Sequence, residues 1–141
     1  MTSKKINNHE YPEVAIILST YNGELYLRDL LDSLIGQTYK NIKIIVRDDG
    51  STDNTCKILN EYQCKHENMS VFFGCKIGVV GSFMQLLELP SDSAKFIAFC
   101  DQDDVWGDCK IEKALNLSTR IKPLTPVLYF SALTVVDAEL N

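Results

Sequence analysis

The 141-residue sequence lacks the features that mark several special classes of protein. Its five cysteines are an odd number and include no CxxC pair, which argues against a disulfide framework and against a zinc site. Lys and Arg total 14 against 19 Asp and Glu, whereas a sequence-independent nucleic-acid binder needs a basic face. No apolar run approaches the roughly 18 residues of a membrane-spanning helix. We therefore expect free thiols in a reducing compartment, in the cytoplasm or at the inner face of the membrane.

The sequence does have the composition of one globular domain. Hydrophobic residues make up 45% of the chain and charged residues 23%, and the length fits one ordinary domain. Residues 1–12 form a polar tail without the apolar core of a signal peptide. We therefore assign the domain to residues 13–141.

Short apolar, β-branched runs alternate with segments of helical periodicity. Strands are predicted at Val14–Leu18, Ile42–Val46, Val71–Phe73, Phe96–Cys100 and Val127–Phe130. Apolar residues recur at helical spacing between them, from Leu27 to Ile35, around Ile58 and Tyr62, from Gly78 to Leu89 with Phe83, Leu86 and Leu87 inward, and from Ile111 to Leu115. This alternation predicts an α/β fold with a mostly parallel central sheet and helices on both faces.

Polar residues and helix breakers mark the expected helix ends. Asn22 is a candidate N-cap of the first helix, Ser51 of the second and Asp108 of the last. Gly36 and Pro90 are expected to end the first and third helices.

Three polar segments directly follow predicted strands. They are Ser19–Gly23, Arg47–Ser51 and Asp101–Trp106. Ligands of open α/β sheets bind at the carboxyl ends of the strands, so these segments are expected to share one crevice. For Asp48 and Asp49, a turn that complements a helix dipole is the alternative interpretation.

The segment from Asp101 to Asp104 carries three carboxylates in four residues, which is hard to explain by packing. Each pair repels by roughly 1 kcal/mol at a surface-like dielectric. A divalent cation offsets this repulsion, and Mg²⁺ or Mn²⁺ commonly binds one or two carboxylates together with substrate phosphates. The chain has no GxxxxGK[ST] loop, so phosphate binding must depend mainly on the metal.

Taken in order, these segments resemble family 2 glycosyltransferases of the GT-A fold. The resemblance rests on VAIILSTYNG at residues 14–23, LDSLIGQT at residues 31–38, IIVRDDGSTD at residues 44–53 and the aspartate cluster. It runs from about Glu13 to the C-terminus, and FCDQDDVW at residues 99–106 is similar to the bacterial rhamnosyltransferase-like branch. The resemblance implies a Rossmann-like GT-A nucleotide-sugar-binding domain.

The resemblance also implies roles for individual residues. Ser19, Thr20 and Tyr21 would line the nucleobase pocket, and Asp49 would accept a hydrogen bond from the uracil or thymine ring N–H, with Asp48 secondary. The donor nucleotide would also contact Asp101 and Asp103, and the metal, Mg²⁺ or Mn²⁺, would be bound at Asp103 and Asp104. Glu24 would be a family motif residue just inside the first helix.

The sequence departs from the family pattern at three places. Cys75 and Ser82 stand where Asn is expected, and Gly107–Cys109 replaces a stretch that often holds Pro after Trp106. Family members that invert the sugar linkage use a carboxylate from a later segment as general base. We therefore expect the general base and the acceptor half beyond Asn141.

The function predicted from the resemblance is transfer of a hexose or deoxyhexose from a UDP- or dTDP-sugar to a glycan or lipid-linked acceptor. Inversion at the sugar and a role in cell-surface polysaccharide synthesis are part of this expectation. One alternative is a donor-binding fragment without transfer activity. Another is a sugar-nucleotidyltransferase, but Ser19–Gly23 lacks the glycine-rich, basic loop which that class needs after its first strand.

Overall fold

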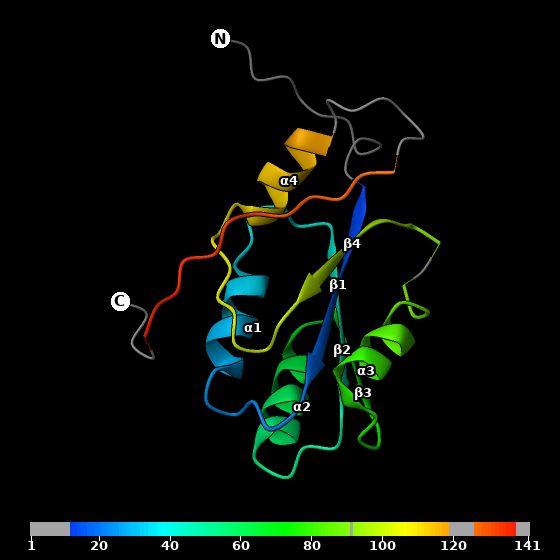
Figure 1. Ribbon diagram of the computed structural model, residues 1–141, viewed down its shortest axis with the longest axis vertical. Coiled ribbons are helices and arrows are strands. Elements are labelled where there is room, and N and C mark those ends of the chain that lie inside the picture. The colour runs from blue at the N-terminus through cyan, green and yellow to red at the C-terminus, as the bar shows by residue number, and fades with distance from the viewer. Residues whose placement is uncertain (1–11, 91, 119–125, 138–141) are drawn as a thin grey trace.

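The computed structural model describes residues 12–90, 92–118 and 126–137. Strands and helices alternate along the chain as β1 (Glu13–Thr20), α1 (Leu27–Ile35), β2 (Ile42–Asp48), α2 (Thr55–Lys65), β3 (Met69–Phe73), α3 (Gly78–Leu86), β4 (Ala94–Cys100) and α4 (Lys110–Ser118). Within these residues the four strands form one sheet in the order β3-β2-β1-β4, and every pair is parallel. The predicted α/β fold with a parallel sheet is confirmed (Figure 1).

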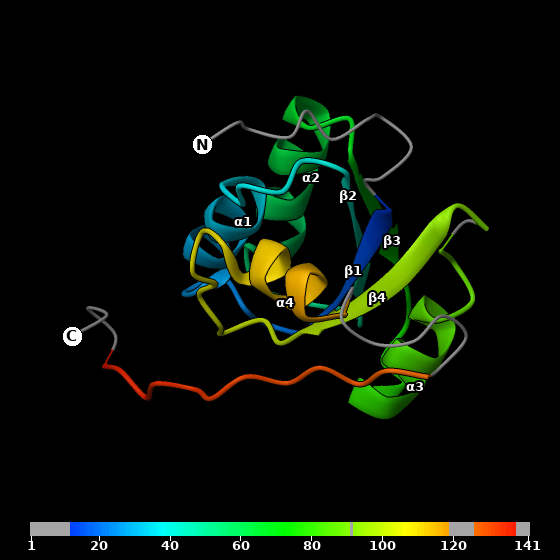
Figure 2. The ribbon, with the colours of Figure 1, turned by 90° about the horizontal axis from the view of Figure 1, so that it is seen from above.

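Helices cover both faces of the sheet. Figure 2 shows α1, α2 and α4 on one side and α3 on the other. Alternate residues of a strand point to opposite faces, so β1 contributes to two cores. Ile16 and Leu18 pack in the cluster that contains the α1 and α2 side chains, whereas Ala15 and Ile17 pack with Leu86 of α3.

The helix α1 forms where the periodicity predicted it. Leu27, Leu30, Leu31 and Leu34 are fully buried, because residues three and four apart share one face of a helix. The helix ends at Gly36, whose N–H donates to the carbonyl of Asp32 over 2.8 Å. Gly36 has a right-handed backbone conformation.

Four expectations about the first three helices are wrong. Asn22 does not cap α1, because the helix begins at Leu27, and Glu24 accordingly lies ahead of the helix. Ser51 does not cap α2, whose N-cap position is Asn54. Leu87 does not face inward, since α3 ends at Leu86 and Leu87 is 37% exposed.

The fifth strand predicted at Val127–Phe130 is also wrong. Residues 126–137 have no regular secondary structure, and Leu128 and Phe130 are 86% and 85% exposed. An apolar run becomes a strand only where a neighbouring strand pairs with its backbone groups, and no such pairing forms here in the described chain. Residues 1–11 of the expected polar tail lie outside the described residues.

Two further observations bear on the class of protein. All five cysteines are free thiols. Of the helices in the described ranges, none combines the length and the apolar character that crossing a membrane requires.

Candidate functional site

The carboxyl ends of the strands bring three loops to one edge of the sheet. Thr20 ends β1, and its Oγ1 donates to Oδ1 of Asp48 at the end of β2 over 2.9 Å. The carbonyl of Thr20 accepts from the N–H of Asp49 over 2.8 Å. In the segment after β4, Gln102 binds the backbone of Tyr21 twice, since its Oε1 accepts from the N–H and its Nε2 donates to the carbonyl, over 2.8 and 3.1 Å. The three predicted segments therefore meet at one edge.

Gly23 and Ser19 lie beside these contacts. A Cβ at Gly23 would lie 2.6 Å from Oε1 of Gln102, so glycine permits the close approach of this side chain. Ser19 is half-buried and lies opposite Arg47 in the parallel pairing of β1 with β2. No role for Gln102 was predicted, and its position between two aspartates gave no signal for one.

The carboxylate of Asp48 is saturated by its own chain. The residue is 1% exposed. Its Oδ1 accepts from the hydroxyls of Thr20 and Ser51, and its Oδ2 accepts from the N–H groups of Gly50 and Ser51 over 3.1 and 2.8 Å. A carboxylate offers about four acceptor positions, so Asp48 holds the loop in shape and has no capacity left for a ligand.

The carboxylate of Asp49 has different partners. It is 3% exposed, and its Oδ1 accepts from Nη1 of Arg47 over 2.6 Å and from the N–H of Ile77 over 2.8 Å. Its Oδ2 accepts from the N–H of Gly78 over 2.8 Å. Burial pushes the pKa of Asp49 upward, but these hydrogen bonds and the Arg47 charge outweigh it and hold the pKa below its ordinary value. Within the described chain, Oδ2 is left with one acceptor position.

Arg47 organises this side of the site, a role that the sequence reading missed. Both side chains of its ion pair with Asp49 are almost fully buried. The guanidinium also donates to Oε1 of Gln85 over 2.8 Å, to Oγ of Ser82 over 3.3 Å and to the carbonyl of Cys75 over 3.0 Å. The two positions where Asn was expected, Cys75 and Ser82, thus serve as acceptors for Arg47. The available signal for an Arg–Asp contact was the spacing of two residues directly after a predicted strand, because residues two apart share one face of an extended chain.

Tyr21 stands at the exposed side of the same edge. Its ring is 37% exposed, and Nζ of Lys76 lies 3.9 Å from the ring centroid. Lys76 follows β3 and precedes α3, so the loop after β3 also contributes to the edge. A cation over an aromatic face is favourable, more so when partly desolvated.

The acidic segment lies in an open position beside these loops. Asp101 and Asp103 are exposed, whereas Asp104 is half-buried. Burial raises the pKa of Asp104, and the charges of Asp101 and Asp103 raise it further. Asp103 and Asp104 line a cleft of about 580 Å³ together with Trp106 and Lys110.

The acidic segment by itself offers too few ligands for a divalent cation. In the described part of the chain, no three His, Cys, Asp or Glu side chains are arranged to hold a metal ion by themselves. A cation bound beside Asp104 would nevertheless offset its repulsion by the charges of Asp101 and Asp103. Mg²⁺ and Mn²⁺ sites of phosphate-binding proteins often use one or two carboxylates and complete their shell with phosphate oxygens and water. The residues present therefore fit a metal that binds together with a diphosphate.

The stretch that replaces the expected proline is held by the turn that follows helix α1. The carbonyl of Gly107 accepts from Nε2 of Gln37 over 2.9 Å, and the carbonyl of Asp108 accepts from the N–H of Thr38 over 2.8 Å. Gln37 is fully buried and its Oε1 accepts from the N–H of Ile111 over 3.2 Å. These contacts fix the start of α4 without a proline.

Comparison with known proteins finds relatives that are sugar transferases. A family model described as Glycosyl transferase family 2 matches residues 15–125. The dTDP-rhamnosyl transferase RfbG of Shigella flexneri is 35% identical over 103 residues, which cover 70% of this chain and 36% of RfbG. TarS 1-349 of S. aureus, solved in complex with UDP-GlcNAc, matches with a TM-score of 0.70 and 28% identity over 77% of this chain and 31% of that chain.

A more distant solved structure shares the fold. The mannosyltransferase PcManGT of Pyrobaculum calidifontis, in complex with GDP-Man and Mn²⁺, matches with a TM-score of 0.66 and 21% identity over 79% of this chain and 33% of that chain. The present chain thus spans about a third of the length of RfbG, at 36%, and of the solved TarS chain, at 31%.

Proposed function

The chain belongs to glycosyl transferase family 2 and has the GT-A fold, and from this premise we propose that it forms the donor-binding part of a sugar transferase. The donor is a UDP- or dTDP-sugar that carries a hexose or deoxyhexose, and the acceptor is a glycan or a lipid-linked sugar. The reaction inverts the linkage at the sugar and serves cell-surface polysaccharide synthesis. The free thiols support a cytoplasmic location.

One observation carries this proposal: the loops after β1, β2 and β4 are hydrogen-bonded to one another at a single edge of the sheet. A nucleoside diphosphate needs contacts to its base, ribose and phosphates, which lie several ångströms apart. Tyr21 and the loop around it offer an aromatic face for the base. The acidic segment, which Gln102 joins to Tyr21, is proposed to bind the sugar and phosphate end.

Asp49 is the residue proposed to recognise the base. Its Oδ2 retains one acceptor position and is suited to one ring N–H, which uracil and thymine both present. The N–H groups of Ile77 and Gly78 and the Arg47 guanidinium together keep Asp49 ionised. An ionised carboxylate accepts stronger hydrogen bonds than a neutral acceptor. Asp48 contributes indirectly, by fixing the loop that carries Asp49.

Asp103 and Asp104 are proposed to hold Mg²⁺ or Mn²⁺ when the donor is bound, with Asp101 toward the ribose. When bound, the metal neutralises negative charge on the departing nucleoside diphosphate. Lys110 lines the same cleft and adds a second positive charge near the phosphates. No residue of this chain is proposed as general base.

Calorimetric titration with UDP and with dTDP, each with and without MnCl₂, tests the proposal; the PcManGT complex with Mn²⁺ guides the choice of metal. We expect metal-dependent binding of at least one nucleotide. The double variant Asp103→Asn/Asp104→Asn should lose the metal dependence. Asp108→Asn is the matched control, because Asp108 is exposed, lies nearby and is outside the cluster. Absence of metal-dependent binding to either nucleotide would overturn the proposal.

A further inference from the structure

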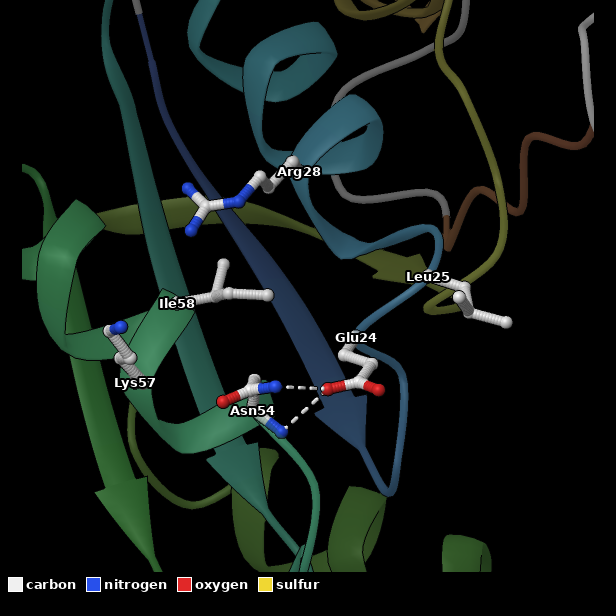
Figure 3. Close-up of a pocket in the computed structure, with 6 residues that line it drawn as sticks. All are labelled: Glu24, Leu25, Arg28, Asn54, Lys57 and Ile58. Carbon is white, nitrogen blue, oxygen red and sulfur yellow. Dashed lines mark hydrogen bonds between the residues drawn. The ribbon is translucent and has the colours of Figure 1, made fainter.

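A pocket of about 390 Å³ lies where the loop after β1 meets the start of α2 (Figure 3). It is lined by Glu24, Leu25, Arg28, Asn54, Lys57 and Ile58. We name residues 21–26 the first loop and residues 49–54 the second loop. Oε2 of Glu24 accepts from the backbone N–H and from Nδ2 of Asn54, both over 2.8 Å, so this side chain joins the two loops.

Further hydrogen bonds run between the loops in both directions. The N–H of Asn22 donates to Oγ of Ser51 over 2.9 Å, and Oδ1 of Asn22 accepts from the N–H of Thr52 over 2.8 Å. The buried N–H of Gly23 donates to Oγ1 of Thr55 at the start of α2 over 2.9 Å. Each loop thus supplies side-chain acceptors for backbone N–H groups of the other.

At the start of α2, one of these bonds takes over part of the role of a helix cap. Neither Tyr26 nor Asn54, the N-cap residues of α1 and α2, makes a side-chain cap hydrogen bond. Glu24 instead accepts from the N-cap N–H of α2, the role that a glutamate within the helix has in a capping box. Asn22 has a φ of 48°, in the left-handed region that Asn tolerates better than most residues.

The position of Tyr21 depends on these contacts. Tyr21 lies between Thr20, which is fixed to Asp48 by strand pairing and by its hydroxyl, and Asn22, which is fixed to the second loop. The second loop carries Asp49. The cross-loop bonds, together with the two bonds of Gln102 to Tyr21, therefore set the distance between the aromatic face and the carboxylate, and both groups belong to the proposed donor site.

We propose that Asn22 and Glu24 are positioning residues of the donor site. Their hydrogen bonds between the two loops hold Tyr21 at a fixed position relative to Asp49. This inference rests on the proposed function. In this role neither side chain contacts the donor. They act by accepting the N–H groups of Thr52 and Asn54, so that both loops have one arrangement before the nucleotide binds.

The test compares the affinity for UDP with Mn²⁺ by calorimetry, at a temperature where circular dichroism shows each variant folded. Asn22→Gly keeps the left-handed backbone and removes the acceptor, and Glu24→Ala removes the bonds to Asn54. Each should weaken binding about tenfold. Asn22→Asp and Glu24→Gln retain an acceptor oxygen and should stay within about threefold of the parent chain. Arg28→Ala is the control, since Arg28 lines the same pocket but bonds to Glu61 in α2.

The outcomes separate this inference from the proposed function. If the parent chain does not bind UDP or dTDP, both the proposed function and the positioning role of Asn22 and Glu24 are overturned. If the parent binds and the folded Asn22→Gly and Glu24→Ala variants bind equally well, with only a lowered melting temperature, the residues are structural and this inference alone is overturned. Equal weakening in Glu24→Gln would also overturn it, because the acceptor is retained there. Should Glu24→Ala not fold, Glu24→Asp replaces it, since it keeps the charge but shortens the reach.

Discussion

Replacing Arg47 with methionine should lower the free energy of unfolding by about 3 kcal/mol. Removing one partner of a buried ion pair costs roughly 3–5 kcal/mol, because the other charge is left without compensation. The structure favours the lower end, since Asp49 keeps the N–H groups of Ile77 and Gly78 and the exposed Gln85 can regain water. For a chain of this length the melting temperature should fall by about 10 °C.

Urea unfolding followed by the fluorescence of Trp106 measures this change. Trp106 is the single tryptophan of the chain and is 3% exposed, so unfolding transfers it to water. The matched control is Arg28→Met, because the Arg28–Glu61 pair is exposed and contributes little. A loss of under about 1 kcal/mol, or a loss no larger than that of Arg28→Met, would refute the account of Arg47 as the counter-ion of a buried Asp49.

The pH dependence of the same variant adds an internal check. In the parent chain the pKa of Asp49 is depressed, so its contribution to stability is present above its unfolded pKa of about 4 and is lost as the pH falls through the folded pKa. Without Arg47, only the N–H groups of Ile77 and Gly78 oppose the effect of burial, so the pKa of Asp49 rises relative to the parent chain and the carboxyl takes up a proton at a higher pH. A neutral carboxyl needs no counter-ion, so the stability difference between variant and parent should shrink below about pH 4.

Three further predictions concern other contacts. Burial, together with a 2.7 Å hydrogen bond to Asp32, raises the pKa of Tyr62 to about 12. The free energy of unfolding should therefore fall as the pH rises from about 10 to 12. Urea unfolding of Tyr62→Phe should show a weaker decrease over this pH range. Gly74→Ala places a Cβ against the Arg47 guanidinium and should lower stability by about 1–3 kcal/mol, measured by the same method; an unchanged midpoint would contradict this. Gln102→Ala removes both bonds to Tyr21 and should weaken UDP binding about tenfold in calorimetry with little change in melting temperature.

The fold could be predicted because its signals are local. The run at Val14–Leu18 is buried on both faces, and the leucines of α1 recur at helical spacing, so strand–helix order followed from periodicity. The parallel sheet then followed from that order. The run at Val127–Phe130 had the same local pattern but no strand pairs with it in the described chain, and pairing is not readable from one segment.

The contacts around the site were predicted less well because they join distant residues. Asn22 was expected to cap the helix that follows it, but its side chain accepts the N–H of Thr52, 30 residues later. Glu24 likewise caps a helix from another part of the chain. The sequence shows only that a side chain such as Asn or Glu can accept a backbone N–H. Which N–H group it accepts depends on how the loops pack.

Asp48 and Asp49 illustrate how neighbouring residues of one type acquire different roles. Successive side chains of an extended chain point to opposite faces. Asp48 therefore turns toward Ser51 and Cys56 on the α2 side, where its acceptor positions are filled, whereas Asp49 shares the α3 side with Arg47. The hydrogen bonds from Ile77, Arg47 and Gly78 and the charge of Arg47 keep Asp49 ionised, while Oδ2 retains one acceptor position. The alternation of faces thus assigns one aspartate to holding the loop and leaves the other able to receive a ligand, which is the division that the proposed base recognition requires.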